Sequence, residues 1–247
     1  MRVFWKMTIV ELKLFIREPT AAFFTLIFPL ILLVIFGGIF GNEPVSKFGG
    51  RGTVDLSVPG YIGMIIATAG LLSLPVTLAA YREKGILKRF QASPVSVPMI
   101  LGSQVTIQTI MLMIGAAGLF TVGRLGYNLS IPSHIFSLFG GFLYSAASFL
   151  SLGFLLAGVL PSAKAANAAG MAMFFPMLFL SGSAMPIELL PKGMRTIAEF
   201  LPLTHVVSLL KGIWFGQGWD LKPVAVLGGL LVLSVLLSTK TFRWQAG

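Results

Sequence analysis

Six long stretches without a charged residue limit the folds that are open to this chain. A helix needs about 20 residues to cross the hydrocarbon core of a bilayer, and backbone groups in lipid must bond to one another. No alternating ten-residue strand pattern, as in a membrane barrel, is present. The sequence therefore predicts an all-α integral membrane protein with six transmembrane helices. The predicted spans are residues 20–41, 58–80, 99–123, 135–160, 165–185 and 223–239.

Composition supports lipid as the medium around the chain. Of the 247 residues, 56% are hydrophobic and 11% are charged, and the mean hydropathy is +0.91. No stretch of mixed polar composition is long enough for a soluble domain. We therefore expect residues 1–247 to form a single transmembrane domain.

The basic residues predict the orientation of the spans. The 18 basic residues outnumber the 8 acidic ones, but they lie in short clusters between the apolar stretches, which argues against a nucleic acid partner. Basic residues beside membrane spans collect on the cytoplasmic side. With six spans, eleven of the 18 fall on one side, so we place both termini in the cytoplasm. The eleven are Arg2, Lys6, Lys13, Arg17, Arg82, Lys84, Lys88, Arg89, Lys164, Lys240 and Arg243.

Two segments outside the spans carry apolar residues of their own. Residues 1–18 place apolar side chains at helical spacing among lysines and arginines, which predicts an amphipathic helix lying on the membrane surface. Residues 186–222 are too polar to span, and prolines interrupt them. We expect two short re-entrant helices there, anchored at the outer interface by Trp214 and Trp219; an ordinary extracellular loop is the alternative.

Several kinds of chemistry have no matching residues. The chain lacks the Gly-x-x-x-x-Gly-Lys-Ser/Thr loop that cradles nucleotide phosphates and contains no cysteine. The six spans hold no Asp, Glu, Lys, Arg or His, which weighs against a proton- or sodium-coupled transporter. An intramembrane protease would need Ser181 or Ser183 with His205, but neither serine has the usual glycine context. We expect no catalytic, cofactor-binding or metal-binding residue.

The charged loop between the second and third spans is the strongest candidate for a functional segment. It covers residues 81–94, is short and amphipathic, and falls on the predicted cytoplasmic side. A helix of this kind docks its apolar face into a groove of a partner protein. A solvated loop that only fixes topology explains the same pattern equally well.

Three motifs in this order resemble the type-2 ABC exporter permeases. The loop residues Glu83-Lys84-Gly85-Ile86-Leu87-Lys88-Arg89, followed by Ser93-Pro94, are similar to the family's Glu-x-Gly-(Thr/Ile)-Leu-x-(Arg/Lys) stretch and its downstream proline. Residues 175–204 resemble its fifth span and outer helices, and Arg17-Glu18-Pro19 resembles its entry into the first span. The resemblance covers the whole chain. It implies the membrane subunit of an ATP-driven exporter in a bacterial or archaeal plasma membrane.

The resemblance also implies partners and contact residues. Two copies of a separate ATP-binding subunit, which would hold ATP and Mg, would contact the charged loop. A second permease copy would pair with this chain, as a homodimer or a heterodimer. The coupling residues would be Arg82, Glu83, Lys84, Gly85, Leu87, Lys88 and Arg89.

The resemblance implies that the second and fifth spans line the pathway or the dimer interface. Their methionines and phenylalanines favour a hydrophobic or amphipathic cargo, such as a drug or a lipid-like molecule, although such residues also commonly face lipid or neighbouring helices. The alternatives are a polysaccharide or glycolipid exporter within the same family, and an ion-coupled secondary transporter. The pathway or interface residues would be Met64, Leu71, Met171, Phe174, Phe175 and Met177.

Overall fold

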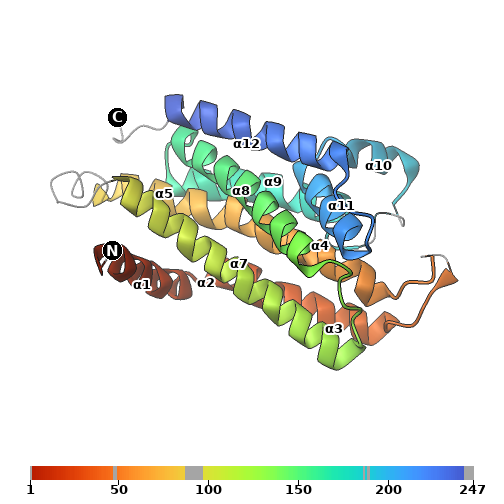
Figure 1. Ribbon diagram of the computed structural model, residues 1–247. Helices are drawn as coiled ribbons and strands as arrows, with labels where there is room; N and C mark the ends of the chain where they lie inside the picture. The colour runs from red at the N-terminus through yellow and green to blue at the C-terminus, as the bar shows by residue number, and fades with distance from the viewer. Residues whose placement is uncertain (1, 47–48, 87–96, 186, 188–189, 242–247) are drawn as a thin grey trace.

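The chain folds into a bundle of helices packed side by side (Figure 1). The computed structural model describes residues 2–46, 49–86, 97–185, 187 and 190–241, and within them the one β-type pairing is an isolated bridge. Within these described ranges, six helices are long and apolar enough to cross a membrane, which confirms the predicted fold class. They are Pro19–Phe40, Thr53–Glu83, Met99–Tyr127, Ile135–Val159, Ala163–Leu180 and Leu221–Lys240.

The first two spans each consist of two α-helices joined by a π-helical turn. Such turns are rare, and they occur mostly as single turns inside α-helices. A proline follows each turn, Pro29 in the first span and Pro75 in the second. Proline lacks the N–H that a regular helix would donate to a carbonyl in the preceding turn. The π turn accommodates this missing hydrogen bond. The first span contains α2 (Pro19–Ala22), η1 (Phe23–Ile27) and α3 (Phe28–Phe40), and the second contains α4 (Thr53–Thr68), η3 (Ala69–Ser73) and α5 (Leu74–Glu83).

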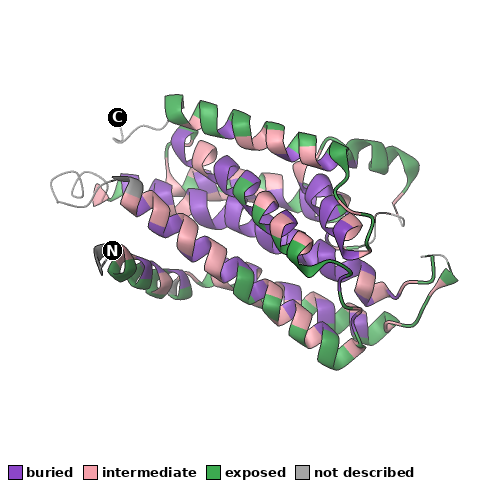
Figure 2. Cartoon of the chain, in the orientation of Figure 1, coloured by how far each residue is buried: buried purple, intermediate pink, exposed green. Residues whose placement is uncertain are grey.

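The second span forms the centre of the bundle. Within its apolar stretch 89% of the residues are buried, against 22% in the first span and 17% in the sixth. Figure 2 shows the exposed residues gathered on the outer helices. The helices around the second span include α7 (Val97–Tyr127), α8 (Ile135–Val159) and α9 (Ala163–Leu180), whereas α12 (Leu221–Thr241) packs on α8.

Glycines allow close backbone contacts at the π turn of the second span. A Cβ on Gly70 would lie 2.3 Å from the carbonyl oxygen of Phe149, and one on Gly153 would lie 2.6 Å from that of Gly70. On the α9 side, a Cβ on Gly170 would lie 2.2 Å from the carbonyl oxygen of Leu71. Small residues commonly bring membrane helices together in this way. The turn is therefore held between α8 and α9.

Two span boundaries differ from the predicted ones by five residues, and the others differ by four residues or fewer. The second span begins at Thr53 rather than Val58, because the helix continues through Pro59. The fifth ends at Leu180 rather than Met185, because Gly182 adopts a positive φ of 84°, which the right-handed helix cannot accommodate.

The N-terminal helix α1 (Arg2–Arg17) is amphipathic, as predicted, and packs along α7. Its buried face differs from a simple apolar stripe, because Thr8 and Glu11 are buried there beside Phe15. Its apolar residues on other faces are exposed, as expected for a helix at a membrane interface. The exposed apolar residues are Trp5, Ile9, Val10, Leu14 and Ile16.

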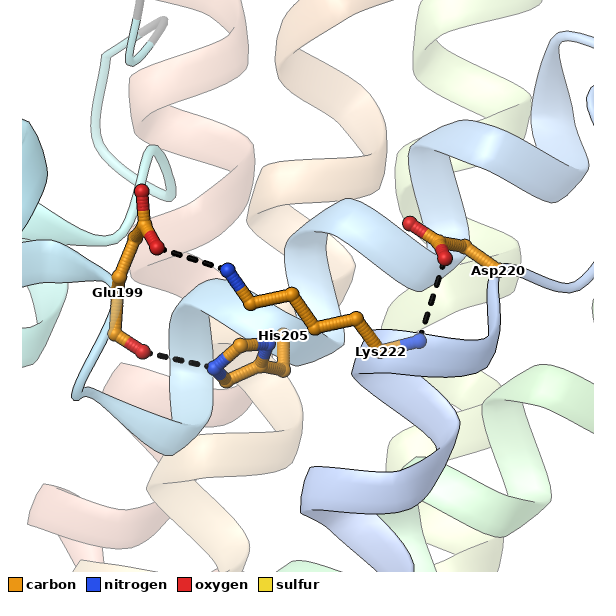
Figure 3. Close-up of polar contacts among 4 residues, drawn as sticks. All are labelled: Glu199, His205, Asp220 and Lys222. Atoms are coloured by element: carbon orange, nitrogen blue, oxygen red, sulfur yellow. Dashed lines mark hydrogen bonds and ion pairs between the residues drawn. The ribbon is translucent and has the colours of Figure 1, made fainter.

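The segment after the fifth span contains two short helices, α10 (Lys192–Ala198) and α11 (Pro202–Trp214), at 96° to each other. Figure 3 shows how polar contacts join their corner to the start of α12. The Lys222 ammonium contacts the Glu199 carboxylate at 2.7 Å, and His205 Nε2 lies 2.8 Å from the Glu199 carbonyl oxygen. Both side chains of the ion pair are more than half exposed, so it stabilises the corner only weakly.

The two tryptophans of this region have different positions. Trp219 is 46% exposed and donates a hydrogen bond to Ser137, which agrees with the expected anchor at an interface. Trp214 is only 2% exposed and packs against Phe120 of α7. The expectation for Trp214 was wrong, because α11 turns its apolar face inward against α4 and α8.

Candidate coupling site at the end of the second span

The second span ends in a tight turn at the end of the bundle where α1 lies (Figure 1). The N–H of Lys84 bonds to the Ala80 carbonyl and the N–H of Gly85 bonds to the Arg82 carbonyl. Gly85 has a φ of 64°, a left-handed conformation that glycine adopts without strain. The predicted contact residues Leu87, Lys88 and Arg89 lie outside the described residues.

Arg82 points into the bundle. Its side chain is 8% exposed, and its guanidinium donates hydrogen bonds to the carbonyl oxygens of Ala157, at 2.9 Å, and of Leu160. The last carbonyls of a helix have no partner within that helix and carry partial negative charge. Arg82 therefore caps the end of α8 and ties the second span to the fourth.

Glu83 and Lys84 are exposed beside this cap. Their side chains are thus accessible to a partner, unlike that of Arg82. Of the predicted contact residues that the structure describes, these two fit a direct role best, Gly85 shapes the turn, and Arg82 positions it.

A buried polar cluster links the same end of the second span to α1 and α7. The Tyr81 hydroxyl donates to the Glu11 carboxylate at 2.5 Å, and Gln104 Nε2 donates to the Tyr81 oxygen at 3.4 Å. All three side chains are less than 10% exposed. Burial raises the pKa of Glu11, and the hydrogen bonds from Tyr81 and Gln104 partly oppose this shift. Buried polar groups of this kind hold their helices in one arrangement.

A second contact fixes the junction between α1 and the first span. The Thr77 hydroxyl lies 3.4 Å from the Glu18 carboxylate. Burial raises the pKa of Glu18 as well, with a smaller opposing influence from Thr77 and Lys84. The N-terminal helix is thus attached to α5 at both Glu11 and Glu18.

Sequence reasoning missed Glu11, Tyr81 and Gln104. These residues lie 70 and 23 positions apart, so no local motif connects them. One signal was present: Glu11 is the only acid within Arg2–Arg17, and it shares a helix face with Thr8 and Phe15. An acid on the face that packs against a neighbour needs a hydrogen-bonding partner.

The residues predicted to line a pathway occupy different environments. Met64, Leu71 and Phe174 are fully buried within this single chain, and Met177 is 6% exposed. Met171 is half-buried. Phe175 is 40% exposed on α9. The second-span members contribute to the core of the chain, so the fifth span provides the accessible surface.

That surface is a stripe along α9 at helical spacing. We call Lys164, Ala168, Ala172, Phe175 and Phe179 the α9 stripe; all five are exposed. Two of them are alanines four residues apart, which permits another helix to approach closely. Ala166 and Gly170, on the opposite face, are buried within the bundle.

The residues considered for hydrolytic or metal chemistry do not form such a site. The hydroxyls of Ser181 and Ser183 bond to each other at 3.0 Å, and His205 contacts a backbone carbonyl (Figure 3). Among the described residues, no three His, Cys, Asp or Glu side chains group to hold a metal ion. Fold and site together define a multi-pass membrane protein whose second span ends in an anchored, charged turn.

Comparison with known proteins identifies the family of this multi-pass protein. The sequence model of the ABC-2 type transporter matches residues 2–215. The chain therefore belongs to the ABC-2 type transporter family, whose members are membrane permeases of ABC transporters.

The chain is similar to two transport permeases over most of its length and to a nodulation protein over a shorter part. It is 25% identical to the transport permease YvfS of Bacillus subtilis, covering 99% of both chains. It is 28% identical to the transport permease ycf38 of Porphyra purpurea, covering 92% of this chain and 79% of that one. It is also 34% identical to nodulation protein J of Rhizobium leguminosarum bv. viciae, covering 39% of this chain and 38% of that protein.

Proposed function

We propose that this chain is the permease subunit of an ATP-driven exporter in a bacterial or archaeal plasma membrane. A separate ATP-binding subunit, present in two copies, holds ATP and Mg and drives the cycle. A second permease copy, identical or related, completes the pathway. Both termini and the loop after α5 face the cytoplasm, where that subunit binds.

The observation that carries the proposal is the anchoring of the loop. Tyr81 and Arg82 are adjacent, and they bond to α1 and α8 respectively. The next two side chains, Glu83 and Lys84, are exposed to a partner. A displacement of the loop is therefore passed to three helices at once, as expected of an element that converts partner closure into helix movement.

The cargo we propose is hydrophobic or amphipathic, a drug or a lipid-like molecule. The α9 stripe supports this choice, because two phenylalanines and two alanines make up most of its exposed side chains. Flat apolar side chains accept varied apolar shapes. A polysaccharide or glycolipid exporter of the same family would be recognised by transport of a sugar-bearing cargo.

A comparison of two glutamates tests the coupling role. The chain is co-expressed with the product of its neighbouring gene, which we expect to be the ATP-binding subunit, and the purified complex is reconstituted in vesicles. We expect Glu83→Ala to lower transport-coupled ATP hydrolysis about fivefold, equivalent to about 1 kcal/mol of coupling free energy. Glu43→Ala, an exposed acid after α3, is the matched control and should leave the rate unchanged. Full coupled activity in Glu83→Ala, or no co-purifying ATPase, would contradict the proposal.

A further inference from the structure

The third and fourth spans are consecutive in sequence but are held apart by the second. α7 packs against α1, α3 and α4, whereas α8 packs against η3, α5, α11 and α12. Figure 1 shows the second span behind the space between them. Two cavities lie along this space, one near each end of the bundle.

The cavity near α11 is almost wholly apolar. It holds about 390 Å³, within the usual range for small-molecule sites. Ile62 of the second span lines it together with α7, α8 and the buried ring of Trp214. The described residues that line it carry no charge, and they include Ala116, Ala117, Phe120 and Phe142.

The second cavity continues along the same two helices toward α1. It holds about 530 Å³ and is lined by Leu101 and Val105 of α7, Phe154 of α8 and Val235 of α12. Hydroxyls from Ser151, Ser238 and Thr239 are its polar groups. Val105 and Met113, which line different cavities, are eight residues apart, or about 12 Å along a helix. The two cavities thus follow the length of the spans.

The mouth of the first cavity faces lipid, from the hydrocarbon at Met113 to the outer interface near Ile135. Its rim residues Met113, Ile135 and Phe139 are 40%, 58% and 50% exposed, and all three belong to membrane spans. Water needs polar partners that this lining does not supply, and an unfilled apolar space forfeits dispersion contacts. The occupant must therefore be apolar, and the absence of charge among the lining residues leaves no place for a headgroup inside.

We propose that the cavity between α7 and α8 near α11 is a lipid site, which one acyl chain of a bilayer phospholipid occupies. The headgroup stays at the membrane surface, beyond the exposed ends of α7 and α8. Such a chain fills the space between α7 and α8, which pack mainly against other helices. The inference concerns the bilayer rather than the cargo, and it holds whether or not the chain is an exporter.

Trp214 provides a direct test, because its ring lines the cavity while its side chain is only 2% exposed. Replacing Trp5, Trp219 and Trp244 by Phe leaves it as the only tryptophan. The full-length protein in mild detergent then receives increasing fractions of phosphatidylcholine with dibrominated acyl chains, which quench indole emission on contact. We expect loss of Trp214 emission at low lipid fraction, reaching a plateau. A matching protein that retains only Trp219, which is 46% exposed, should lose emission in proportion to total lipid.

A cavity-filling variant locates the bound chain. Ala117→Phe should abolish the loss of Trp214 emission, whereas Ala147→Phe, on the exposed face of α8 outside both cavities, should preserve it. The proposal is overturned by unchanged Trp214 emission in fully brominated lipid, by a loss proportional to total lipid as at Trp219, or by quenching that survives Ala117→Phe. Should Ala117→Phe fail to elute as a monodisperse species, the plateau test on the single-tryptophan protein decides alone.

Discussion

The carboxyl group of Glu11 determines how the N-terminal helix responds to pH. Burial raises its pKa above the ordinary 4.5, so the docked helix binds more protons than the undocked helix between 4.5 and the raised value. The contribution to stability is fully present below pH 4.5 and is lost as pH rises through the raised pKa. Docking of α1 therefore weakens as the carboxyl ionises.

We predict that Glu11→Gln removes this pH dependence while keeping an oxygen that accepts from Tyr81. Thermal unfolding in detergent between pH about 5 and about 8 measures it. Tyr81→Phe should lower the free energy of unfolding by about 1–3 kcal/mol, because the buried Glu11 carboxyl group loses its hydrogen-bond donor. Glu43→Gln, exposed at the other end of the bundle, should change neither quantity. A pH dependence that persists in Glu11→Gln would show that another group causes it.

Among the helices, sequence reasoning succeeded on what composition determines and failed on what packing determines. Freedom from charge located all six spans, because lipid tolerates few ionisable groups. It could not rank them by burial: the first span has a mean hydropathy of 2.7 and is 22% buried, whereas the second has a mean hydropathy of 2.0 and is 89% buried. In a bilayer, apolar side chains suit lipid as well as protein. Hydropathy therefore does not report burial.

The pairs of small residues on α9 also show that sequence does not determine which helix face is buried. Ala166 with Gly170 and Ala168 with Ala172 each have the spacing of four residues that favours contacts between membrane helices, but this spacing identifies no partner for either pair. In the structure the first pair is buried, with Gly170 against the second span, and the second pair is exposed. Which pair packs depends on how α9 is rotated in the bundle. Contacts with other helices determine that rotation.

We predict that Gly170→Ala destabilises the bundle. The new Cβ would lie 2.2 Å from the Leu71 carbonyl oxygen, a backbone atom that cannot move without shifting the π turn. Overpacking of this kind costs about 1–3 kcal/mol of unfolding free energy. Gly229→Ala, on α12 with open space around it, is the control and should be neutral or stabilise by up to about 1 kcal/mol. Equal unfolding midpoints for the two variants would rule out the close contact.

The orientation of the bundle in the membrane can be tested at two exposed residues at its opposite ends. Lys84 follows α5 and Glu43 follows α3, and both are exposed. The chain has no cysteine, so Lys84→Cys and Glu43→Cys each introduce a single thiol. In right-side-out vesicles we predict that a membrane-impermeant maleimide labels Glu43→Cys directly, and Lys84→Cys only after permeabilisation. Labelling of Lys84→Cys in sealed vesicles would place the loop outside and exclude an ATP-binding subunit there.

The α9 stripe predicts how two permease copies meet. Fully apolar side chains of one chain gain little by facing another protein rather than lipid, so close packing of small residues decides which faces associate. Ala168 and Ala172 provide this on α9, beside Phe175 and Phe179. In a homodimer, Ala172→Cys should form a disulfide between chains under mild oxidation in membranes. Val232→Cys, which is 56% exposed on α12, should not. Cross-linking through α12 rather than α9 would move the interface to the sixth span and leave the stripe facing lipid.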